Sequence, residues 1–327
     1  MKICFFAKVR DREILRYNEF YANDIRCLRE LGHDVRLATH PRELGPADAY
    51  FVWWWTWAWA PVAVAKTLRR PVVVTGVFDY DDYPQRPPAH RVLMDLALRY
   101  ADANIFLSKL ERELVPSRIR TRNPLYSPCV IDTDIYSPAE APREKFVLTI
   151  AWMNNGNSRR KCIPEVIQVA ARLHACFPDY RFVIAGEKGS DYHEVLAPLV
   201  QRLGAADYIE FPGVVSREQK VNLLQRCSLY LQPSRFEGFG VGNLEALACG
   251  APTLTSPVGA VPEVVGDAAE LVSGIDVELL SEAARGLIED ESKRAALSTR
   301  GRERAVREFS FERRKRDLEA ALAGASG

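Results

Sequence analysis

The sequence predicts an α/β fold in which two Rossmann-like, doubly wound domains of parallel strands face a central cleft. The chain has 327 residues, enough for two domains that each bury their own core. Short apolar stretches alternate with stretches of helical periodicity, which is typical of parallel sheets covered by helices. The alternation starts afresh after the proline-rich stretch 123–142, which indicates a connection between two domains.

In the first half, short apolar runs indicate strands, and apolar residues at helical spacing indicate the helices between them. The strands are expected at 2–7, 34–38, 49–54, 71–75 and 104–107. The helices are expected at 19–31, 62–68 and 91–100. The first of these helices is followed by Gly32, a common helix-ending residue.

The second half repeats the pattern. Its strands are expected at 146–151, 181–185, 208–211, 229–232 and 252–255. Its helices are expected at 163–173, 216–227 and 243–249. A charged helical tail covers 278–323. Ser216 and Gln219 form a capping-box signature at one helix start. We place the domains at 1–135 and 136–305, and we expect the C-terminal helix at 306–327 to pack back toward the first domain.

The charge balance argues against a dedicated nucleic-acid binder. Lys and Arg number 44 against 43 Asp and Glu, so the formal net charge is +1 and no nucleic-acid partner is expected. The basic cluster 313–316 could meet phosphates or anionic lipid, although a solvated helix face explains it more simply. A peripheral contact with the inner face of a membrane therefore stays open.

The cysteines and the N-terminus indicate a cytoplasmic protein. The seven cysteines include no CxxC pair or compact Cys/His cluster, so neither a disulfide framework nor a metal site is expected. Residues 1–10 lack a secretory pattern. The uncharged run 49–65 is short for a membrane span and contains Pro61, so we interpret it as a strand, a turn and a helix.

A dinucleotide-dependent dehydrogenase is a poor fit. Its fingerprint, G-x-G-x-x-G, should directly follow the first strand, where glycines let the backbone approach pyrophosphate. Here the first strand is followed by 8–12, which contains no glycine, and the glycines of 238–243 break the spacing late in the chain.

The glycine-rich segment 233–246 follows a predicted strand and leads into a helix. The unpaired amides and the dipole of a helix N-terminus favour an anion such as a diphosphate. Glu237 lies just before the glycines and Glu245 in the first helical turn, so both carboxylates can accept hydrogen bonds from the hydroxyls of a ribose or hexose. A glycine-rich turn whose glutamate merely complements the helix dipole is the alternative.

The spacing of Glu237 and Glu245 resembles the E-x7-E signature of the retaining nucleotide-sugar glycosyltransferases of family four, which have the GT-B fold. The similarity covers 125–275 in family order, whereas over 1–120 it is only architectural. The further matching parts are 130–136, Lys161, 182–186, 211–216, 248–252 and 259–265. The resemblance implies an acceptor-side first domain and a donor-binding second domain.

The resemblance also implies roles for single residues. Glu245 would bind the donor ribose, and Glu237 the hydroxyls of the transferred sugar. Backbone amides of the turn would hold the phosphates, and the donor-binding candidates are Gly238, Phe239, Gly240, Val241, Gly242, Gly186 and Val214. Arg160 and Lys161 would neutralise the leaving diphosphate.

One position departs from the family pattern. Family members usually have an arginine about five residues before the lysine, where this chain has Gly156. Arg159 or Arg160 must then supply the guanidinium, and the sequence leaves open which one does.

The first half lacks the family's glycine-rich acceptor loop and its histidine. Asp79 is the nearest polar candidate to orient the acceptor hydroxyl, and Phe78 a neighbouring acceptor contact. Asp79 and Asp81 also spell D-x-D, a metal-binding pattern of the other glycosyltransferase fold, but two carboxylates in a polar loop are commonplace.

Tryptophans are concentrated after the third strand. Trp57 and Trp59 are expected beyond the strand end, where they would stack on a sugar or an apolar acceptor, with core packing as an equal alternative. For Trp53 and Trp54 we prefer core packing.

We therefore expect a retaining, metal-independent transferase that moves a hexosyl unit from a UDP- or GDP-linked sugar to a hydroxyl of a carbohydrate, lipid-linked or small-molecule acceptor. Such a reaction belongs to polysaccharide, glycolipid or glycoconjugate biosynthesis. No cofactor is expected besides the nucleotide sugar as co-substrate. The alternatives are a sugar-nucleotide-binding protein without turnover and a GT-B sugar-nucleotide epimerase.

Overall fold

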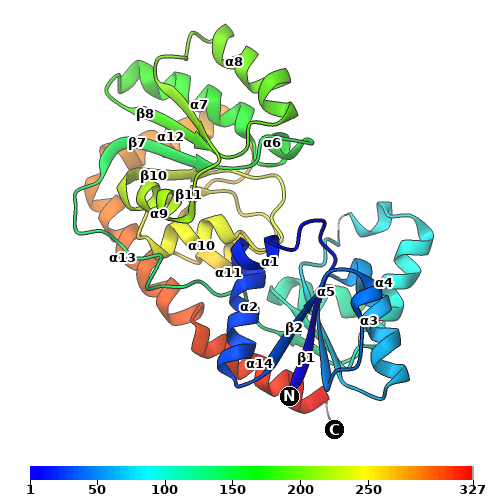
Figure 1. The fold of residues 1–327 in the computed structure, drawn as a ribbon. Helices are drawn as coiled ribbons and strands as arrows, with labels where there is room; N and C mark the ends of the chain where they lie inside the picture. Colours follow the sequence, from blue (N-terminus) through cyan, green and yellow to red (C-terminus); the bar gives the residue numbers. More distant parts are fainter. Residues whose placement is uncertain (81, 326–327) are drawn as a thin grey trace. The chain divides into compact units, whose positions relative to one another are not determined.

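The computed structural model describes residues 1–80 and 82–325, which form two compact units (Figure 1). Unit 1 comprises 1–132 together with the C-terminal segment from Phe309, and unit 2 comprises 133–308. The sequence-based boundaries are 135 and 305, whereas the units divide after Asp132 and before Phe309, and the C-terminal segment is grouped with unit 1.

Unit 1 contains a parallel six-stranded sheet in the order β2-β1-β3-β4-β5-β6. Its strands are β1 (Lys2–Ala7), β2 (Asp34–Ala38), β3 (Ala49–Trp53), β4 (Val72–Gly76), β5 (Ala103–Phe106) and β6 (Pro124–Tyr126). Strands β3, β4 and β5 are buried throughout, which accounts for their continuous apolar sequence. The strand order reverses between β1 and β3, and ligands of such sheets bind beside this switch point.

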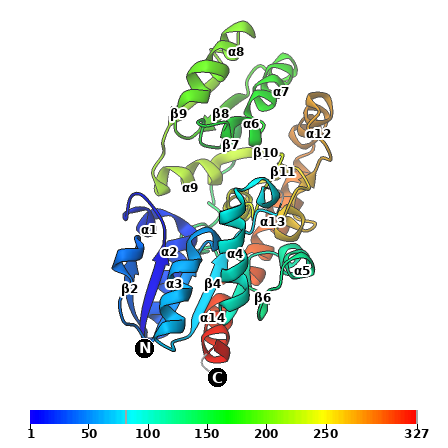
Figure 2. The same cartoon turned by 90° about the vertical axis from the view of Figure 1, so that its right-hand side faces the viewer.

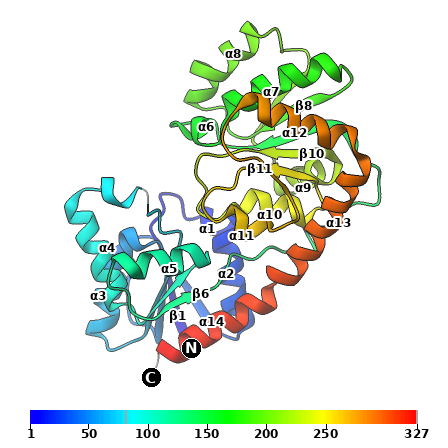
Figure 3. The same cartoon turned by 180° about the vertical axis from the view of Figure 1, so that it is seen from behind.

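Helices cover the sheet of unit 1, and one further helix of this unit belongs to the C-terminal segment. They are α1 (Ile14–Tyr17), α2 (Glu19–Glu30), α3 (Trp55–Thr67), α4 (Pro88–Tyr100), α5 (Lys109–Arg118) and α14 (Phe311–Ala325). Helices α3 and α4 pack against each other (Figure 2). The C-terminal α14 packs against α2, β4 and β5 (Figure 3).

Two local expectations for unit 1 were wrong. Helix α3 begins at Trp55 rather than at 62, because the left-handed backbone of Trp54 (φ 77°) makes the turn and Pro61 is accommodated inside the helix. Residues 124–126 are not merely part of a connection but form β6, which pairs with β5. Because β6 is an edge strand, it tolerates a proline at its first position.

Unit 2 contains a second parallel six-stranded sheet, in the order β12-β11-β10-β7-β8-β9. The strands are β7 (Glu144–Ile150), β8 (Arg181–Ala185), β9 (Ile209–Gly213), β10 (Cys227–Gln232), β11 (Thr253–Thr255) and β12 (Glu270–Leu271). The order reverses between β7 and β10, which defines the switch point of this unit.

Eight α-helices accompany this sheet among the described residues. They are α6 (Asn157–Arg160), α7 (Ile163–Cys176), α8 (Ala197–Arg202), α9 (Arg217–Arg226), α10 (Val241–Ala248), α11 (Val261–Val265), α12 (Val277–Glu289) and α13 (Glu291–Glu308). The predicted capping box at the start of α9 is confirmed, because Ser216 and Gln219 exchange both hydrogen bonds.

Candidate functional site

The candidate site lies at the switch point of unit 2, where the chain leaves β7 and β10. The segment after β7 carries Arg160 and Lys161, and the segment after β10 carries Glu237 and the glycine turn. The two segments touch directly, because the Arg235 amide donates to the Arg160 carbonyl at 2.8 Å. Residues widely separated in the sequence therefore meet at one edge of the sheet.

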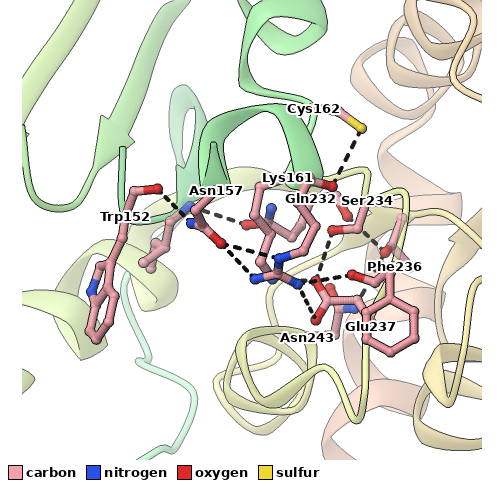
Figure 4. A network of polar contacts seen from close by, with 12 residues as sticks. Trp152, Asn157, Lys161, Cys162, Gln232, Ser234, Phe236, Glu237 and Asn243 are labelled. Carbon is pink, nitrogen blue, oxygen red and sulfur yellow. Dashed lines mark hydrogen bonds and ion pairs between the residues drawn. The ribbon is translucent and has the colours of Figure 1, made fainter. Parts of the chain in front are cut away.

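Glu237 stands at the centre of these contacts (Figure 4). Its Oε1 is paired with Nζ of Lys161 and accepts a hydrogen bond from Oγ of Ser234 at 2.8 Å. Nη1 of Arg160 lies 3.7 Å from Oε2. Because the Glu237 side chain is only 7% exposed, its charge requires such partners.

Arg160, rather than Arg159, is the arginine that reaches the turn. Its Nη1 donates to the Phe236 carbonyl at 2.9 Å. The side-chain oxygen of Asn157 accepts from Nε at 3.2 Å and from Nη2 at 2.7 Å, which fixes the guanidinium plane. The sequence offered no sign of this role for Asn157, because it depends on how α6 is placed.

The short helix α6 is itself anchored by Asp191. The carboxylate accepts hydrogen bonds from the Gly156 amide at 3.0 Å and from the Ser158 hydroxyl at 2.7 Å. Burial alone would raise the pKa of Asp191, but these hydrogen bonds outweigh it and lower the pKa. Asp191 therefore stays ionised and holds the segment that carries the two cations.

Glycines allow the chain to turn tightly at the start of α10. Gly240 has a left-handed backbone (φ 89°) at the N-cap of the helix. A Cβ on Gly242 would lie 2.8 Å from the hydroxyl oxygen of Tyr230. Gly259 lies between β11 and α11 but contacts the same turn. A Cβ on Gly259 would lie 1.9 Å from the carbonyl oxygen of Glu237, so only glycine fits there.

The glycine turn leads into the N-terminus of α10, the kind of helix end that favours an anion. Val241 and Gly242 are the first residues of α10, whose leading amides find no acceptor within the helix. Gly238 precedes the helix in the turn, whereas the Phe239 side chain is buried.

Glu245, the second carboxylate, is buried and has two partners that the sequence did not reveal. Lys220 of α9 pairs with its Oε1, and the hydroxyl of Tyr136 donates to the same oxygen at 3.2 Å. Nζ of Lys220 also lies 5.2 Å from the centre of the Tyr136 ring. Tyr136 belongs to the matched segment 130–136, but Lys220 looks like any exposed helical lysine.

The other donor-binding candidates lie at the ends of β8 and β9. A Cβ on Gly186 would lie 1.8 Å from the Ala151 carbonyl oxygen, so this glycine is needed where β7 and β8 end side by side. Its amide donates to the Gly213 carbonyl at 2.9 Å. Val214 follows directly and is exposed at the same edge of the sheet.

Three buried polar atoms near the turn have no hydrogen-bond partner among the described residues. They are Nε2 of Gln232, Oδ1 of Asn243 and Oγ of Ser256. Such atoms are rare in folded proteins and leave hydrogen-bonding capacity near the turn. The sequence gave no sign of them.

In unit 1, the acceptor-side candidates differ in their burial and in their hydrogen bonds. The Phe78 ring is 2% exposed and packs edge-on against Trp55, which corrects the expectation that it faces an acceptor. Oδ1 of Asp79 accepts from the Asp82 amide at 3.0 Å, so it shapes the local turn. Asp81 of the D-x-D pattern lies outside the described residues.

The tryptophans also differ in how far they are buried. The Trp53 ring is buried as expected, and its Nε1 donates to Asp24 at 3.0 Å. Trp57 is exposed on α3, where Nζ of Lys8 lies 5.8 Å from its ring centre, and Trp59 is half-buried beside it. Lys8 follows β1 and α3 follows β3, so these side chains lie near the switch point of unit 1.

Residues 139–304 match the family described as glycosyl transferases group 1. The chain belongs to this family. The predicted family and GT-B fold are thereby confirmed, and the match includes every site residue discussed for unit 2 except Tyr136. The acceptor-side candidates of this group 1 glycosyl transferase lie outside the matched range.

Curated relatives support the assignment at moderate identity. The chain is 27% identical over 304 residues to the GDP-mannose-dependent alpha-(1-6)-phosphatidylinositol monomannoside mannosyltransferase of Mycolicibacterium smegmatis, covering 86% of this chain and 78% of that protein. It is 35% identical over 133 residues to the O-antigen chain mannosyltransferase B of Escherichia coli, covering 41% and 34%. Against four such relatives the chain spans only 34% to 52% of their length.

Solved structures share the fold of this group 1 glycosyl transferase. Sucrose-phosphate synthase of Thermosynechococcus elongatus superimposes with a TM-score of 0.82 at 17% identity, covering 99% of this chain and 98% of that one. Anabaena HepE, solved with UDP and glucose, gives 0.78 at 18% identity and covers 99% of both chains. In the described part of the chain, no helix combines the length and apolarity needed to cross a bilayer.

Proposed function

We propose that the protein is a retaining glycosyltransferase that moves a hexosyl unit from a nucleoside diphosphate sugar to an acceptor hydroxyl. One observation carries the proposal: Arg160 and Lys161 meet Glu237 beside the glycine turn at the switch point of unit 2. This places two cations, a helix N-terminus and a carboxylate at one position, which suits a sugar joined to a diphosphate.

Each group of the donor has a matching group in the site. The diphosphate would take Lys161 and Arg160 as partners, together with the leading amides of α10. Glu237, released from Lys161, would accept hydrogen bonds from the transferred sugar. Glu245 would accept the ribose hydroxyls through Oε2, because Lys220 and Tyr136 occupy Oε1.

The reaction then needs charge stabilisation more than a side-chain base. As the bond from the anomeric carbon to the diphosphate breaks, negative charge grows on the leaving oxygens beside Lys161 and Arg160. The acceptor oxygen forms its bond on the same face of the sugar, and its proton passes to a phosphate oxygen. Because two fixed cations neutralise the leaving group, we propose turnover without a metal ion and without a further cofactor.

The names of the relatives support a choice of donor and acceptor classes. Two matched proteins are named as GDP-mannose-dependent mannosyltransferases acting on phosphatidylinositol monomannosides, and HepE was solved with UDP-glucose. We propose a GDP- or UDP-linked hexose and a carbohydrate, lipid-linked or small-molecule acceptor. Asp79, Trp57 and Trp59 of unit 1 are the proposed acceptor contacts. All seven cysteines are free thiols, which fits the proposed cytoplasmic location.

The test is a donor and acceptor screen with the purified chain. GDP-mannose and UDP-glucose are incubated with acceptor panels, nucleoside diphosphate release is measured, and the anomeric configuration of the product is read by NMR. We expect transfer with retention that survives EDTA. Manganese-dependent turnover would refute metal independence, and an inverted product would refute retention. Isomerised donor in the absence of acceptor would instead identify an epimerase.

A further inference from the structure

Trp152, two residues beyond the end of β7, carries an exposed aromatic ring in unit 2. Its side chain is 62% exposed, whereas its neighbours Ala151 and Met153 are buried in the core that β7 shares with α7. Side chains of an extended segment point to opposite faces of the sheet in turn. The Trp152 ring therefore lies on the face of the sheet opposite to α7.

That face also carries the start of α10. Leu148 of β7 is paired with Tyr230 of β10, so both side chains point to one face, and Trp152 follows Leu148 by two full alternations. The Tyr230 hydroxyl lies directly below α10, because a Cβ on Gly242 would be 2.8 Å from it. The exposed indole and the glycine turn therefore share one face of the sheet.

The backbone that carries this ring is fixed on both sides. The amides of Ala151 and Met153 donate to carbonyls at the end of β8 at 2.9 Å and 3.0 Å. The Trp152 carbonyl accepts from Nδ2 of Asn157 at 2.5 Å. Only the two side-chain torsions of Trp152 stay free, so ordering the ring against a ligand costs little conformational entropy.

Asn157 joins Trp152 to the arginine of the candidate site. While its Nδ2 donates to the Trp152 carbonyl, its Oδ1 accepts from the Arg160 guanidinium at 2.7 Å and 3.2 Å. Figure 4 shows Asn157 between Trp152 and Glu237, with the indole extending away from the contacts around Glu237. The ring is thus attached to the segment that would hold the diphosphate, but it lies outside those contacts.

One part of the donor has no partner in the proposed function, on which this inference rests. Glu237 would take the transferred sugar, Arg160 and Lys161 the diphosphate, and Glu245 the ribose. The nucleobase is the part that remains. A base is a flat ring with exposed faces, and such rings stack on exposed aromatic side chains.

The neighbouring strand ends leave room for such a ring. Gly186 ends β8 without a side chain, and Val214 follows β9 and is 77% exposed. Since β8 lies between β7 and β9, two strand spacings, about 10 Å, separate the chain at Trp152 from the chain at Val214. A base stacked on Trp152 would lie over Gly186, with Val214 on its other side.

We propose that Trp152 stacks on the nucleobase of the donor and favours a purine. The two fused rings of a purine overlap the two fused rings of the indole more fully than the single ring of a pyrimidine does. Trp152 would therefore determine donor specificity without touching the reacting atoms. The inference deepens the proposed function, because it selects a GDP- or ADP-linked sugar over a UDP-linked one.

The experiment is calorimetric titration of the full chain with GDP, ADP, UDP and inorganic pyrophosphate. Trp152→Ala should weaken GDP binding about tenfold to a hundredfold, since stacking on an aromatic side chain contributes that much per base. UDP should lose less, and pyrophosphate nothing, because it has no base. The matched control Tyr100→Ala removes an exposed aromatic ring of α4 in unit 1 and should keep the wild-type Kd for GDP.

Trp152→Phe supplies a second readout. The smaller ring should keep part of the affinity for GDP, while the quenching of tryptophan fluorescence that GDP causes in the wild type should disappear. Quenching that persists in this variant would show that the base stacks elsewhere. Thermal melting of each variant shows that it is folded.

The remaining outcomes separate this inference from the proposed function. An unchanged Kd for GDP in Trp152→Ala would overturn the stacking role, as would an equal loss for pyrophosphate. Equal losses for GDP and UDP would overturn the purine preference. Lys161→Ala should weaken GDP and pyrophosphate alike, and if neither weakens, or if the wild type binds no nucleotide, the proposed function fails as well. A loss in Lys161→Ala without one in Trp152→Ala refutes only the role of Trp152.

Discussion

The ammonium group of Lys161 is paired with the buried carboxylate of Glu237, 76 residues later in the chain. In the proposed reaction both groups have other partners, the diphosphate for Lys161 and the sugar hydroxyls for Glu237. When no donor is present, the Glu237 carboxylate is therefore the anion that neutralises the cations, a role that a phosphate group takes over in the proposed complex. Donor binding must exchange one anion for another, which makes the site sensitive to charge changes at either residue.

Lys161→Ala should lower kcat by about a hundredfold to a thousandfold, because its charge interaction grows as the leaving group departs. Steady-state kinetics with the donor found in the screen measure the effect. The matched control is Lys145→Ala, which removes an exposed lysine paired with Asp179 in the same unit and should leave kcat unchanged. Equal kcat in the two variants would contradict the role of Lys161.

Glu237→Gln should have opposite effects on binding and turnover. The free nucleoside diphosphate should bind about tenfold more tightly, because Lys161 and Arg160 are no longer neutralised by a carboxylate. Transfer should fall, because the amide is a weaker acceptor for the sugar hydroxyls. Calorimetric titration with GDP and UDP checks the first effect, and weaker diphosphate binding by the variant would show that Glu237 does not compete for the cations.

Lys220→Ala should raise the donor KM by about tenfold while kcat changes little, because Lys220 positions Glu245 and does not touch the reacting atoms. A structural defect alone would not alter ribose recognition. The variant should therefore also lose the preference for a ribose donor over its 2′-deoxy analogue. Undiminished discrimination would argue against this positioning role, and Lys220→Arg should restore part of it.

Arg314→Ala should destabilise unit 1 by about 3–5 kcal/mol, since it leaves Asp24 buried without its cation. The Arg314 guanidinium contacts Asp24 through Nε and Nη2, both at 2.8 Å, and also donates to the Ser127 carbonyl. Urea unfolding measures the loss. The control Arg307→Ala removes an exposed arginine and should leave the midpoint of urea unfolding unchanged.

A thiol reagent should modify one cysteine per native chain at pH 8. Cys176 is exposed, whereas the other six are buried. Burial raises the pKa to about 12 for Cys27, Cys129, Cys162, Cys227 and Cys249, so these thiols stay protonated and unreactive. All seven should react in denaturant, and Cys176→Ser should abolish the native reaction. Rapid modification of further thiols in the native state would contradict the burial pattern.

Much of the fold could be predicted because its signals are local. The apolar runs at β1 and β8, the capping box at Ser216 and the glycines before α10 depend on neighbours in the chain. Helix α3 was placed too late because Pro61 indicated a boundary that the tertiary packing does not respect. Strand β6 was missed because a proline-rich edge strand has the same composition as a connection.

For the site, spacing within short segments predicted the two carboxylates, the glycine turn and the basic pair, and the structure brings Glu237 into contact with the basic pair. The sequence could not choose between Arg159 and Arg160, pair Lys220 with Glu245, or show that Phe78 is buried. Those facts depend on which strand ends lie side by side and which helix faces meet. Such long-range contacts arise only when the parallel strands assemble, so no local pattern of residues records them.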